Sequence, residues 1–366
     1  MKVATVVGTR PEIIRLSAVM PALDRAFEHV VIHTGQNYDP RLNQIFFKEL
    51  GLNPPTFSLR TDGVVDSMLS RLSDTFKTLT PDALLILGDT NSCFAAAYAA
   101  KRLKIPVFHM EAGNRCFDER VPEEINRRLI DHISDINMPY SSIAREYLLR
   151  EGIPADRIIK TGSPLFEVLA RYRDKIEQSS VLTRLELKPR DYFVVSCHRE
   201  ENVDSPERLK QFIELLNALA RKYSQRVVIS VHPRTRKRLI AENANFAPEV
   251  MLSEPFGFFD YVHLQKYARV TLSDSGTITE ESVIMDFPAL NIRDAHERPE
   301  GMEEGSVIMT GLWPERVFES IAFLEQSENR RSIPRDYLVE NVSEKVVKIL
   351  LSYKDYINRV VWRKSV

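Results

Sequence analysis

Three acidic side chains, in separate short segments, have the character of acid-base catalysts: Asp89, Glu111 and Glu123. Nearby like charges and burial raise the pKa of a carboxylic acid toward neutrality, which a proton donor or acceptor at carbon requires. We therefore expect proton transfer at a carbon atom. A plainer interpretation stays open for Glu123, because it stands at i, i+4 from Arg127 and could form an exposed ion pair in the acidic first turn of a helix.

A second group of residues has the types that bind phosphate. Asp274-Ser275-Gly276-Thr277 precedes a helical pattern, so its hydroxyls and backbone N–H groups could hold a diphosphate at a helix N-terminus. Glu280 and Glu281 follow one turn later. Arg10 and Arg15, near the start of the first expected helix, add positive charge. These residues predict a nucleotide diphosphate as the ligand.

The elements that would position these residues alternate between strand and helix, which is typical of parallel strands joined by crossover helices. Runs rich in Val, Ile and Leu predict strands over residues 3–7, 29–33, 83–87, 107–110, 136–138, 158–161, 192–196, 227–231, 250–252, 270–273 and 289–292. Amphipathic stretches predict helices over residues 93–101, 124–134, 141–151, 206–222, 278–285 and 315–325, and two C-terminal helices over 342–353 and 354–364.

Polar residues gather where these strands end. Ligands of open parallel sheets bind beyond the carboxyl ends of the strands, and nine such positions carry Gly, Asp, Glu, His or Arg. One such loop could merely mark the end of a strand, but nine predict a binding rim. We expect an α/β fold of two doubly wound Rossmann-like domains facing each other across a cleft. Residues 1–165 would form the acid-base side and 166–341 the nucleotide side, with 342–366 packing back on the first domain.

Composition excludes several classes of protein. The chain has 366 residues, of which 43% are hydrophobic and 28% charged, as in packed domains. Fifty basic and 51 acidic residues leave a net charge of -1, so no overall field attracts nucleic acid or an anionic membrane. The apolar runs are too short for a signal peptide or a membrane span. Three cysteines without C-x-x-C spacing predict no disulfide framework, and we expect a cytosolic protein.

Missing motifs narrow the chemistry further. The 13 glycines contain no G-x-G pair, and no Gly-Lys-Ser/Thr element suggests a P-loop. No G-x-S-x-G segment marks a serine hydrolase. His198, His232 and His296 lie in separate expected loops, without the i, i+4 spacing of a zinc helix. We expect neither a cofactor nor a metal.

Seven segments resemble the non-hydrolysing UDP-N-acetylglucosamine 2-epimerases, and the resemblance covers nearly the whole chain. They are Gly8-Thr9-Arg10-Pro11-Glu12, Gly88-Asp89-Thr90, His109-Met110-Glu111-Ala112-Gly113, Pro122-Glu123-Glu124 with Asn126-Arg127, His198-Arg199-Glu200, Asp274-Ser275-Gly276 with Glu280-Glu281, and Glu297-Arg298-Pro299-Glu300. The resemblance implies a GT-B-like fold, a homodimer, no nicotinamide and no metal.

The resemblance also implies roles for individual residues. It implies that Asp89, Glu111 and Glu123 are the acid-base carboxylates, and that His198 lies close to the diphosphate and the sugar. It places Arg127 near these carboxylates. It implies that the UDP moiety is held by Arg10, His232, Ser275, Gly276, Glu281 and Arg293.

The reaction implied is inversion at C2 of a UDP-2-acetamido sugar through a 2-acetamidoglycal. Arg15 stands where the family usually has Lys, and residues 35–39 lack the Gln-His-Arg sequence of the glucosamine enzymes. These features resemble the capsule and O-antigen branch, which converts UDP-2-acetamido-2,6-dideoxy-L-talose to UDP-N-acetyl-L-fucosamine. The alternatives are a UDP-N-acetylglucosamine 2-epimerase making UDP-N-acetylmannosamine, a hydrolysing 2-epimerase, a GT-B glycosyltransferase and a non-catalytic UDP-sugar-binding protein.

Overall fold

The chain forms two compact units, each built on a parallel sheet. The computed structural model describes residues 1–36, 44–61, 63–231, 233–326 and 332–364. Unit 1 comprises Met1–Arg171 and Arg335–Val366, and unit 2 comprises Tyr172–Pro334. The expected divisions at 165/166 and 341/342 stay predictions; within unit 1, the chain around Ser163 is hydrogen-bonded to the segment that follows Arg335. The Ser163 N–H donates to the Asp336 carbonyl oxygen at 3.0 Å.

Unit 1 has a six-stranded sheet in which all neighbouring strands are parallel. In spatial order the strands are β3 (Phe57–Ser58), β2 (Glu28–His33), β1 (Lys2–Val7), β4 (Ala83–Leu87), β5 (Val107–Met110) and β6 (Ile136–Met138). The central strands β1, β4 and β5 are almost entirely buried apolar runs, as expected for parallel strands covered on both faces.

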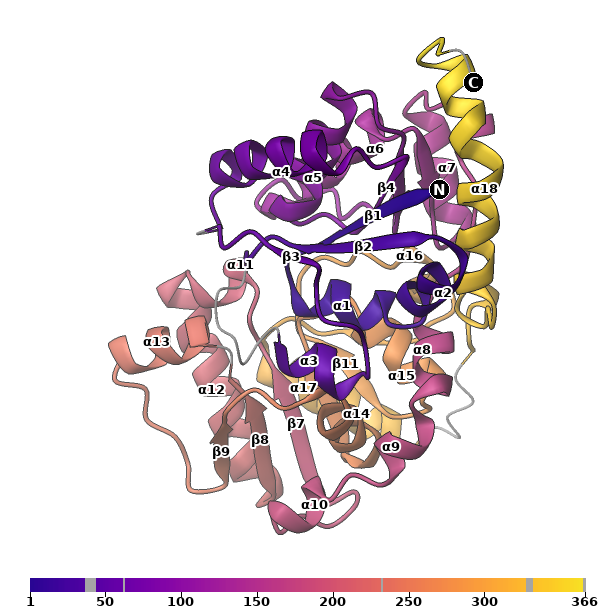
Figure 1. The fold of residues 1–366 in the computed structure, drawn as a ribbon. Helices are drawn as coiled ribbons and strands as arrows, with labels where there is room; N and C mark the ends of the chain where they lie inside the picture. The colour runs from indigo at the N-terminus through magenta and orange to yellow at the C-terminus, as the bar shows by residue number, and fades with distance from the viewer. Residues whose placement is uncertain (37–43, 62, 232, 327–331, 365–366) are drawn as a thin grey trace. The chain divides into compact units, whose positions relative to one another are not determined.

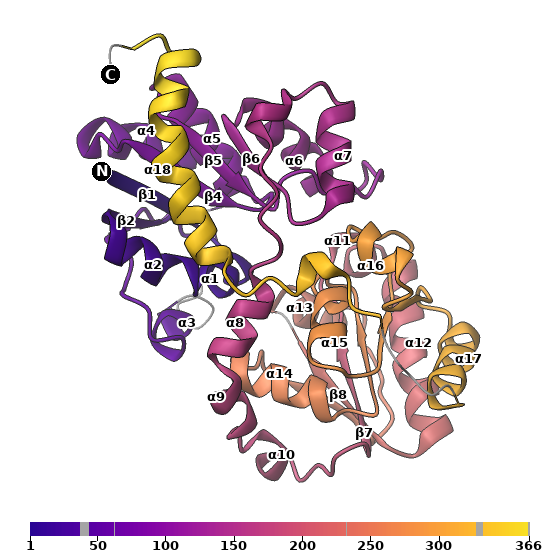
Figure 2. The ribbon, with the colours of Figure 1, turned by 90° about the vertical axis from the view of Figure 1, so that its right-hand side faces the viewer.

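Helices cover both faces of this sheet. The helical segments of unit 1 are α1 (Arg10–Leu16), α2 (Val19–Ala26), α3 (Gln44–Glu49), α4 (Val65–Leu79), α5 (Asn91–Arg102), α6 (Pro122–Ile133), α7 (Ser142–Arg150), the 3₁₀ turn η2 (Ala155–Arg157), α8 (Leu165–Arg171), the 3₁₀ turn η3 (Arg335–Tyr337) and α18 (Val342–Val360). Helices α4 and α5 pack on one face, and α1 and α2 lie on the other (Figure 1). The C-terminal helix α18 runs beside α2 (Figure 2).

Unit 2 repeats this plan with a second parallel sheet. In spatial order its strands are β12 (Ile308–Met309), β11 (Ala289–Asn291), β10 (Val270–Ser273), β7 (Tyr192–Ser196), β8 (Arg226–Ser230) and β9 (Val250–Ser253). Its helices are α9 (Arg173–Glu177), α10 (Val181–Arg184), α11 (Glu200–Val203), α12 (Pro206–Tyr223), α13 (Pro233–Ala241), α14 (Phe258–Tyr267), α15 (Ile278–Ile284), α16 (Pro299–Glu303) and α17 (Pro314–Gln326). Helices α12 and α17 bury apolar side chains against one face and α14 against the other.

Two predicted elements differ from the structure. Residues 158–161 do not form a strand: Ile158 makes only an isolated bridge to Asn137. Thr161 donates its N–H to the carbonyl oxygen of Pro139, and proline has no N–H with which to continue the ladder. The C-terminus forms one helix, α18, instead of two, because no glycine or proline interrupts the helical spacing of its buried side chains, which include Val346, Leu350 and Ile357.

Candidate active site

The loop after β1 is organised by the buried carboxylate of Glu12. This side chain accepts hydrogen bonds from the Gly8 N–H at 2.6 Å and the Thr9 N–H at 2.7 Å, so it caps α1. It also accepts from the Thr90 hydroxyl at 2.6 Å, which joins the loops after β1 and β4. Burial raises the pKa of Glu12, although the bonds from Thr90 and Gly8 act in the opposite direction. Glu12 belongs to a motif noted above but was not predicted to organise the site.

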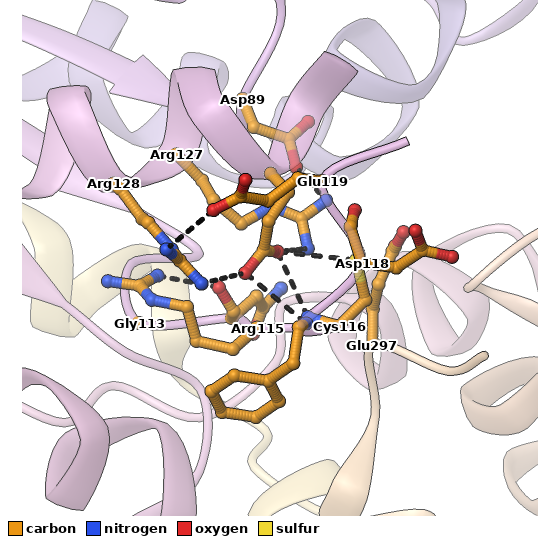
Figure 3. A network of polar contacts seen from close by, with 12 residues as sticks. Asp89, Gly113, Arg115, Cys116, Asp118, Glu119, Arg127, Arg128 and Glu297 are labelled. Atoms are coloured by element: carbon orange, nitrogen blue, oxygen red, sulfur yellow. Dashed lines mark hydrogen bonds and ion pairs between the residues drawn. The ribbon is translucent and has the colours of Figure 1, made fainter. Parts of the chain in front are cut away.

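Asp89 and Arg127 form an ion pair beyond the end of β4. Arg127, on α6, places Nη2 at 2.7 Å from Asp89 Oδ2 (Figure 3). The arginine side chain is 3% exposed and the aspartate 27% exposed, so the carboxylate keeps a face open while its partner is fixed. Asn126 donates its side-chain N–H to the Asp89 carbonyl oxygen at 3.1 Å. Arg127 is therefore in direct contact with Asp89, one of the carboxylates expected to transfer protons.

Glu111 follows β5 in an unusual backbone conformation. Its φ of 66° lies in the left-handed region, which costs a non-glycine residue about 1–3 kcal/mol. Its carboxylate accepts from Asn114 Nδ2 at 3.1 Å and from the Tyr140 hydroxyl at 3.4 Å, and Arg15 Nε lies 3.9 Å away. The Arg15 guanidinium also lies over the Tyr140 ring, 5.5 Å from its centroid. These neighbours hold a partly accessible carboxylate beside a buried cation.

Helix α6 begins with two adjacent carboxylates that have different surroundings. Pro122 is the first residue of the helix, so Glu123 stands in its first turn, where it is partly exposed. Glu124 is fully buried, and it accepts from the Cys116 N–H at 3.0 Å. Its oxygens also pair with Arg127 Nη1 at 3.2 Å and Arg128 Nη2 at 3.0 Å. Glu124 therefore anchors structure, while Glu123 keeps access to solvent.

The structure thus brings the unit 1 predictions to one rim of one sheet. Arg10 is the first residue of α1, and its guanidinium lies 5.6 Å from the centroid of the Phe46 ring. All these residues stand past the carboxyl end of a strand or in the first turns of the following helix: Arg10, Arg15, Asp89, Glu111, Glu123 and Arg127. Tyr140 and Asn114 were missed. Tyr140 follows the short strand β6, whose carboxyl end carries no cluster of charged residues.

In unit 2 a buried aspartate organises the loop that carries His198. Asp274 Oδ2 accepts from the backbone N–H groups of His198 and Arg199, both at 2.9 Å. Its Oδ1 lies 3.0 Å from His198 Nδ1. Burial acts to raise the pKa of Asp274, but the nearby His198 charge and these hydrogen bonds outweigh it and hold the pKa well below its usual range. The His198 side chain is 40% exposed, so its ring is accessible at the rim.

Arg293 and the hydroxyl segment before α15 complete this rim. The Arg293 side chain is 2% exposed and pairs with Glu297 at 3.0 Å and Glu201 at 3.1 Å. Ser275 Oγ lies 3.0 Å from Thr277 Oγ1, and both residues are partly exposed. Gly276 lies between them, partly exposed, and Glu281, in the first turn of α15, accepts from Gln265 Nε2 at 2.8 Å. His232 and residues 37–39 lie outside the described residues.

Two features are absent from the part of the chain that the structure describes: a cluster of metal ligands and a membrane-spanning helix. Within residues 1–36, 44–61, 63–231, 233–326 and 332–364, no group of three or more His, Cys, Asp or Glu side chains is arranged to hold a metal ion. In the same ranges, none of the helices combines the length and the apolar character needed to cross a bilayer.

Similar proteins identify the family. Residues 21–351 match the family described as UDP-N-acetylglucosamine 2-epimerase. The UDP-N-acetylglucosamine 2-epimerase from Rickettsia bellii, a solved structure, is 45% identical in sequence to this chain. The match covers 100% of each chain, with a TM-score of 0.92. The Methanocaldococcus jannaschii UDP-GlcNAc 2-epimerase, in complex with UDP-GlcNAc and UDP, is 35% identical with a TM-score of 0.91 over 96% of this chain and 100% of that one.

A curated relative from Pseudomonas aeruginosa is a UDP-2,3-diacetamido-2,3-dideoxy-D-glucuronate 2-epimerase. It is 32% identical over 330 residues, which cover 87% of this chain and 91% of that protein. The likeness to the solved structures confirms the expected α/β, GT-B-like fold class. The family match and the similarity to these relatives show that the chain belongs to the UDP-N-acetylglucosamine 2-epimerase family, a family of isomerases.

Proposed function

We propose that this enzyme inverts C2 of a UDP-2-acetamido sugar by eliminating UDP and adding it back. The observation that carries the proposal is the pair of carboxylates on adjacent strands of unit 1. Asp89 follows β4 and Glu111 follows β5, each partly accessible and each near a buried arginine. Such a pair can remove a proton from one face of a carbon atom and return one to the other.

The chemistry explains why UDP must leave. The hydrogen at C2 of an N-acetylhexosamine has no adjacent carbonyl to delocalise a carbanion, so direct deprotonation faces a prohibitive barrier. If the bond between C1 and the diphosphate oxygen breaks first, the electron pair leaves with UDP and C1 becomes oxocarbenium-like. The C2 proton is then acidic, and a carboxylate can take it to leave a 2-acetamidoglycal. Protonation of C2 on the opposite face and return of UDP to C1 complete the inversion.

The predicted residues divide into three groups by role in this proposal. Asp89, Glu111 and Glu123 transfer protons, and Arg127 holds one of them in place. His198 stabilises the departing diphosphate. The remaining residues bind the UDP moiety: Arg10, Arg15, His232, Ser275, Gly276, Thr277, Glu281 and Arg293. The partly exposed hydroxyls of Ser275 and Thr277, just before α15, support this division.

For the sugar itself, we propose UDP-2-acetamido-2,6-dideoxy-L-talose, converted to UDP-N-acetyl-L-fucosamine for capsule or O-antigen synthesis. Support comes from the sequence features of residues 35–39 and Arg15. The relatives are named for UDP-N-acetylglucosamine and for a diacetamido glucuronate, which shows that related chains accept different substituents. UDP-N-acetylglucosamine is the competing substrate. Each sugar should be offered separately while C2 inversion is followed by NMR; turnover of UDP-N-acetylglucosamine alone would overturn this choice.

The reaction itself is tested in deuterated water without added nicotinamide. We expect the product to carry deuterium at C2 while UDP remains attached to the sugar at equilibrium. A product without deuterium would refute proton exchange through solvent-accessible carboxylates. Stoichiometric release of free UDP would identify the hydrolysing alternative, and transfer of the sugar to an acceptor would identify a glycosyltransferase.

We further propose that the enzyme acts as a homodimer in the cytosol. The homodimer rests on the family resemblance, and the reducing compartment rests on Cys93, Cys116 and Cys197, which are free and buried. Size-exclusion chromatography with light scattering measures the assembly, and a monomeric mass at working concentrations would contradict the proposal.

A further inference from the structure

A buried carboxylate on α6 contacts the loop that carries Glu111 directly and the loop that carries Asp89 through His109. Asp131 is 1% exposed and lies near the C-terminal end of the helix. Its oxygens lie 3.0 Å from His109 Nδ1 and 2.8 Å from Arg115 Nη1, and they accept from the Gly113 N–H at 3.1 Å. The reaction proposed above gives none of these residues a part.

The first branch leads to Asp89 through His109. The Nε2 atom of His109 lies 2.8 Å from the Gly88 carbonyl oxygen, and because a carbonyl can only accept, Nε2 carries the proton. Gly88 has a φ of 87° and immediately precedes Asp89. The imidazole ring therefore spans the distance between the Asp131 carboxylate and the peptide from which Asp89 projects.

The second branch leads to Glu111 through the backbone. Gly113 has a φ of 81°, and an added Cβ would stand 2.4 Å from the Ala144 carbonyl oxygen, so only glycine fits this turn. Its N–H is held by Asp131, two residues after the left-handed Glu111. A strained residue keeps its conformation only when its surroundings impose it. The bond from Gly113 to Asp131 is one such constraint.

The third branch reaches the Glu111 side chain through Arg115. The guanidinium of Arg115 pairs with Asp131 and, on its other side, with Glu151 at 2.5 Å. Its Nη1 also donates to the Asn114 carbonyl oxygen at 2.6 Å. Asn114 in turn donates to Glu111 Oε1 at 3.1 Å. The Asp131 charge thus influences both the backbone and the carboxylate of Glu111.

We propose that Asp131 is a positioning residue that fixes Asp89 and Glu111 relative to each other for proton transfer at the sugar. This inference rests on the proposed function. It adds a cause for the geometry: one buried anion, on the helix that also supplies Arg127, bonds directly to the Glu111 loop and reaches the Asp89 loop through His109. Removing its charge should disturb the two carboxylates together, without touching the loops that bind the nucleotide in unit 2.

The test is Asp131→Asn, with Asp135→Asn as the matched control. Asp135 is equally buried, accepts from the Val107 N–H at 2.9 Å and pairs with Lys101 at 2.5 Å, but it sits at the amino end of β5, away from the site. We expect Asp131→Asn to lower kcat about tenfold to a hundredfold with unchanged KM and UDP affinity, since misplacement by about 1 Å costs on this order. Asp135→Asn should lower the thermal midpoint and keep kcat.

The proposal is overturned if Asp131→Asn turns over at the wild-type rate, or if both variants lose kcat in proportion to their loss of stability. A wild-type enzyme that epimerises neither UDP sugar refutes the proposed function instead, and this inference with it. Circular dichroism and calorimetric titration with UDP establish that each variant is folded.

If Asp131→Asn fails to fold, a second pair of variants tests the branch that runs through His109. In His109→Gln the side-chain amide reaches the position of Nε2 and can still donate to the Gly88 carbonyl, whereas in His109→Asn it reaches only the position of Nδ1. We expect the glutamine variant to retain more kcat than the asparagine variant, at unchanged KM. Equal kcat in the two variants would overturn the branch to Asp89 and with it the proposed role.

Discussion

Replacing Asp274 by asparagine should destabilise unit 2 strongly, because one buried carboxylate holds the whole His198 loop. The carboxylate accepts the N–H groups of His198 and Arg199 at 2.9 Å, and His198 Nδ1 lies 3.0 Å from its other oxygen. Asparagine has nearly the same shape but no charge and only one accepting oxygen. Its amide N–H₂ group would therefore face at least one of the donors that Asp274 satisfies.

The magnitude follows from these three contacts. A hydrogen bond to a charged group contributes about 1.5–3 kcal/mol and one between neutral groups about 0.5–1.5 kcal/mol, so each contact loses roughly 1 kcal/mol. The sum, about 3 kcal/mol, agrees with the usual cost of breaking a buried ion pair. For a unit of this size, such a loss lowers the thermal midpoint by roughly 6–12 °C.

Differential scanning calorimetry at neutral pH measures this loss, and Asp294→Asn is the control. Asp294 is in the same unit and pairs with Arg208 at 2.8 Å, but its side chain is 52% exposed. An exposed ion pair contributes less than about 1 kcal/mol, so the control should stay close to wild type. If the two variants have equal thermal midpoints, the reasoning from the buried hydrogen bonds is refuted.

The same residue predicts a pH dependence. The folded-state pKa of Asp274 lies well below the unfolded value of about 3.9. Its stabilising contribution is therefore complete above that value and is lost as the pH falls toward the folded-state pKa. The difference in unfolding free energy between wild type and Asp274→Asn should narrow below about pH 4. A difference that stays constant down to pH 2–3 would contradict the assignment.

Four further predictions concern unit 1 and the cysteines. Glu124→Gln should lower the free energy of unfolding by about 3 kcal/mol in urea titrations, since it removes the buried anion that pairs with Arg127 and Arg128 and accepts the Cys116 N–H. Gly8→Ala should destabilise by about 1–3 kcal/mol in the same assay, because the new Cβ would stand 2.0 Å from a serine oxygen. Burial raises the pKa of all three cysteine thiols, so iodoacetamide should label them, by mass spectrometry, in urea but not in the native enzyme. Asp89→Asn and Glu111→Gln should lose deuterium incorporation at C2 yet bind UDP in calorimetry, whereas Arg10→Ala should bind UDP more weakly. A wild-type unfolding curve for Glu124→Gln or Gly8→Ala would contradict the stability argument for that variant. Rapid labelling of the native enzyme would contradict the burial of the thiols. Parallel loss of turnover and UDP affinity in all the site variants would contradict the separation of catalytic from UDP-binding residues.

Much of the fold could be predicted because buried parallel strands have a local signature. Strands β4, β5, β7 and β10 are short, mostly apolar runs, each followed directly by Gly, Glu, Cys or Asp. Their predicted bounds agree with the structure. The two-residue strands β3 and β12 could not be predicted, since two residues show no periodicity. Helix α4 could have been: its buried Met68, Leu72 and Phe76 recur every four residues.

The site could be predicted only as a set of positions. Parallel strands end at one edge of a sheet, so the sequence places Asp89 and Glu111 at the same rim. The ion pair from Arg127 to Asp89 depends instead on how α6 packs against α5 and β5, which local sequence does not encode. The left-handed backbone of Glu111 was equally hidden, because the residues that impose it are brought together by tertiary packing.

Both units contain buried carboxylates that hold a loop through its backbone N–H groups. Other polar side chains beside these loops stay partly exposed. Glu12, Glu124 and Asp274 each accept at least two backbone N–H groups from a loop at a rim. A buried anion that is satisfied by N–H donors fixes the path of the backbone before any ligand arrives. Neighbouring groups, such as Asp89 and His198, can then stay partly exposed without losing their orientation. Because proton transfer at C2 requires carboxylates that are both accessible and fixed, the buried acids are as necessary to the proposed reaction as the exposed ones.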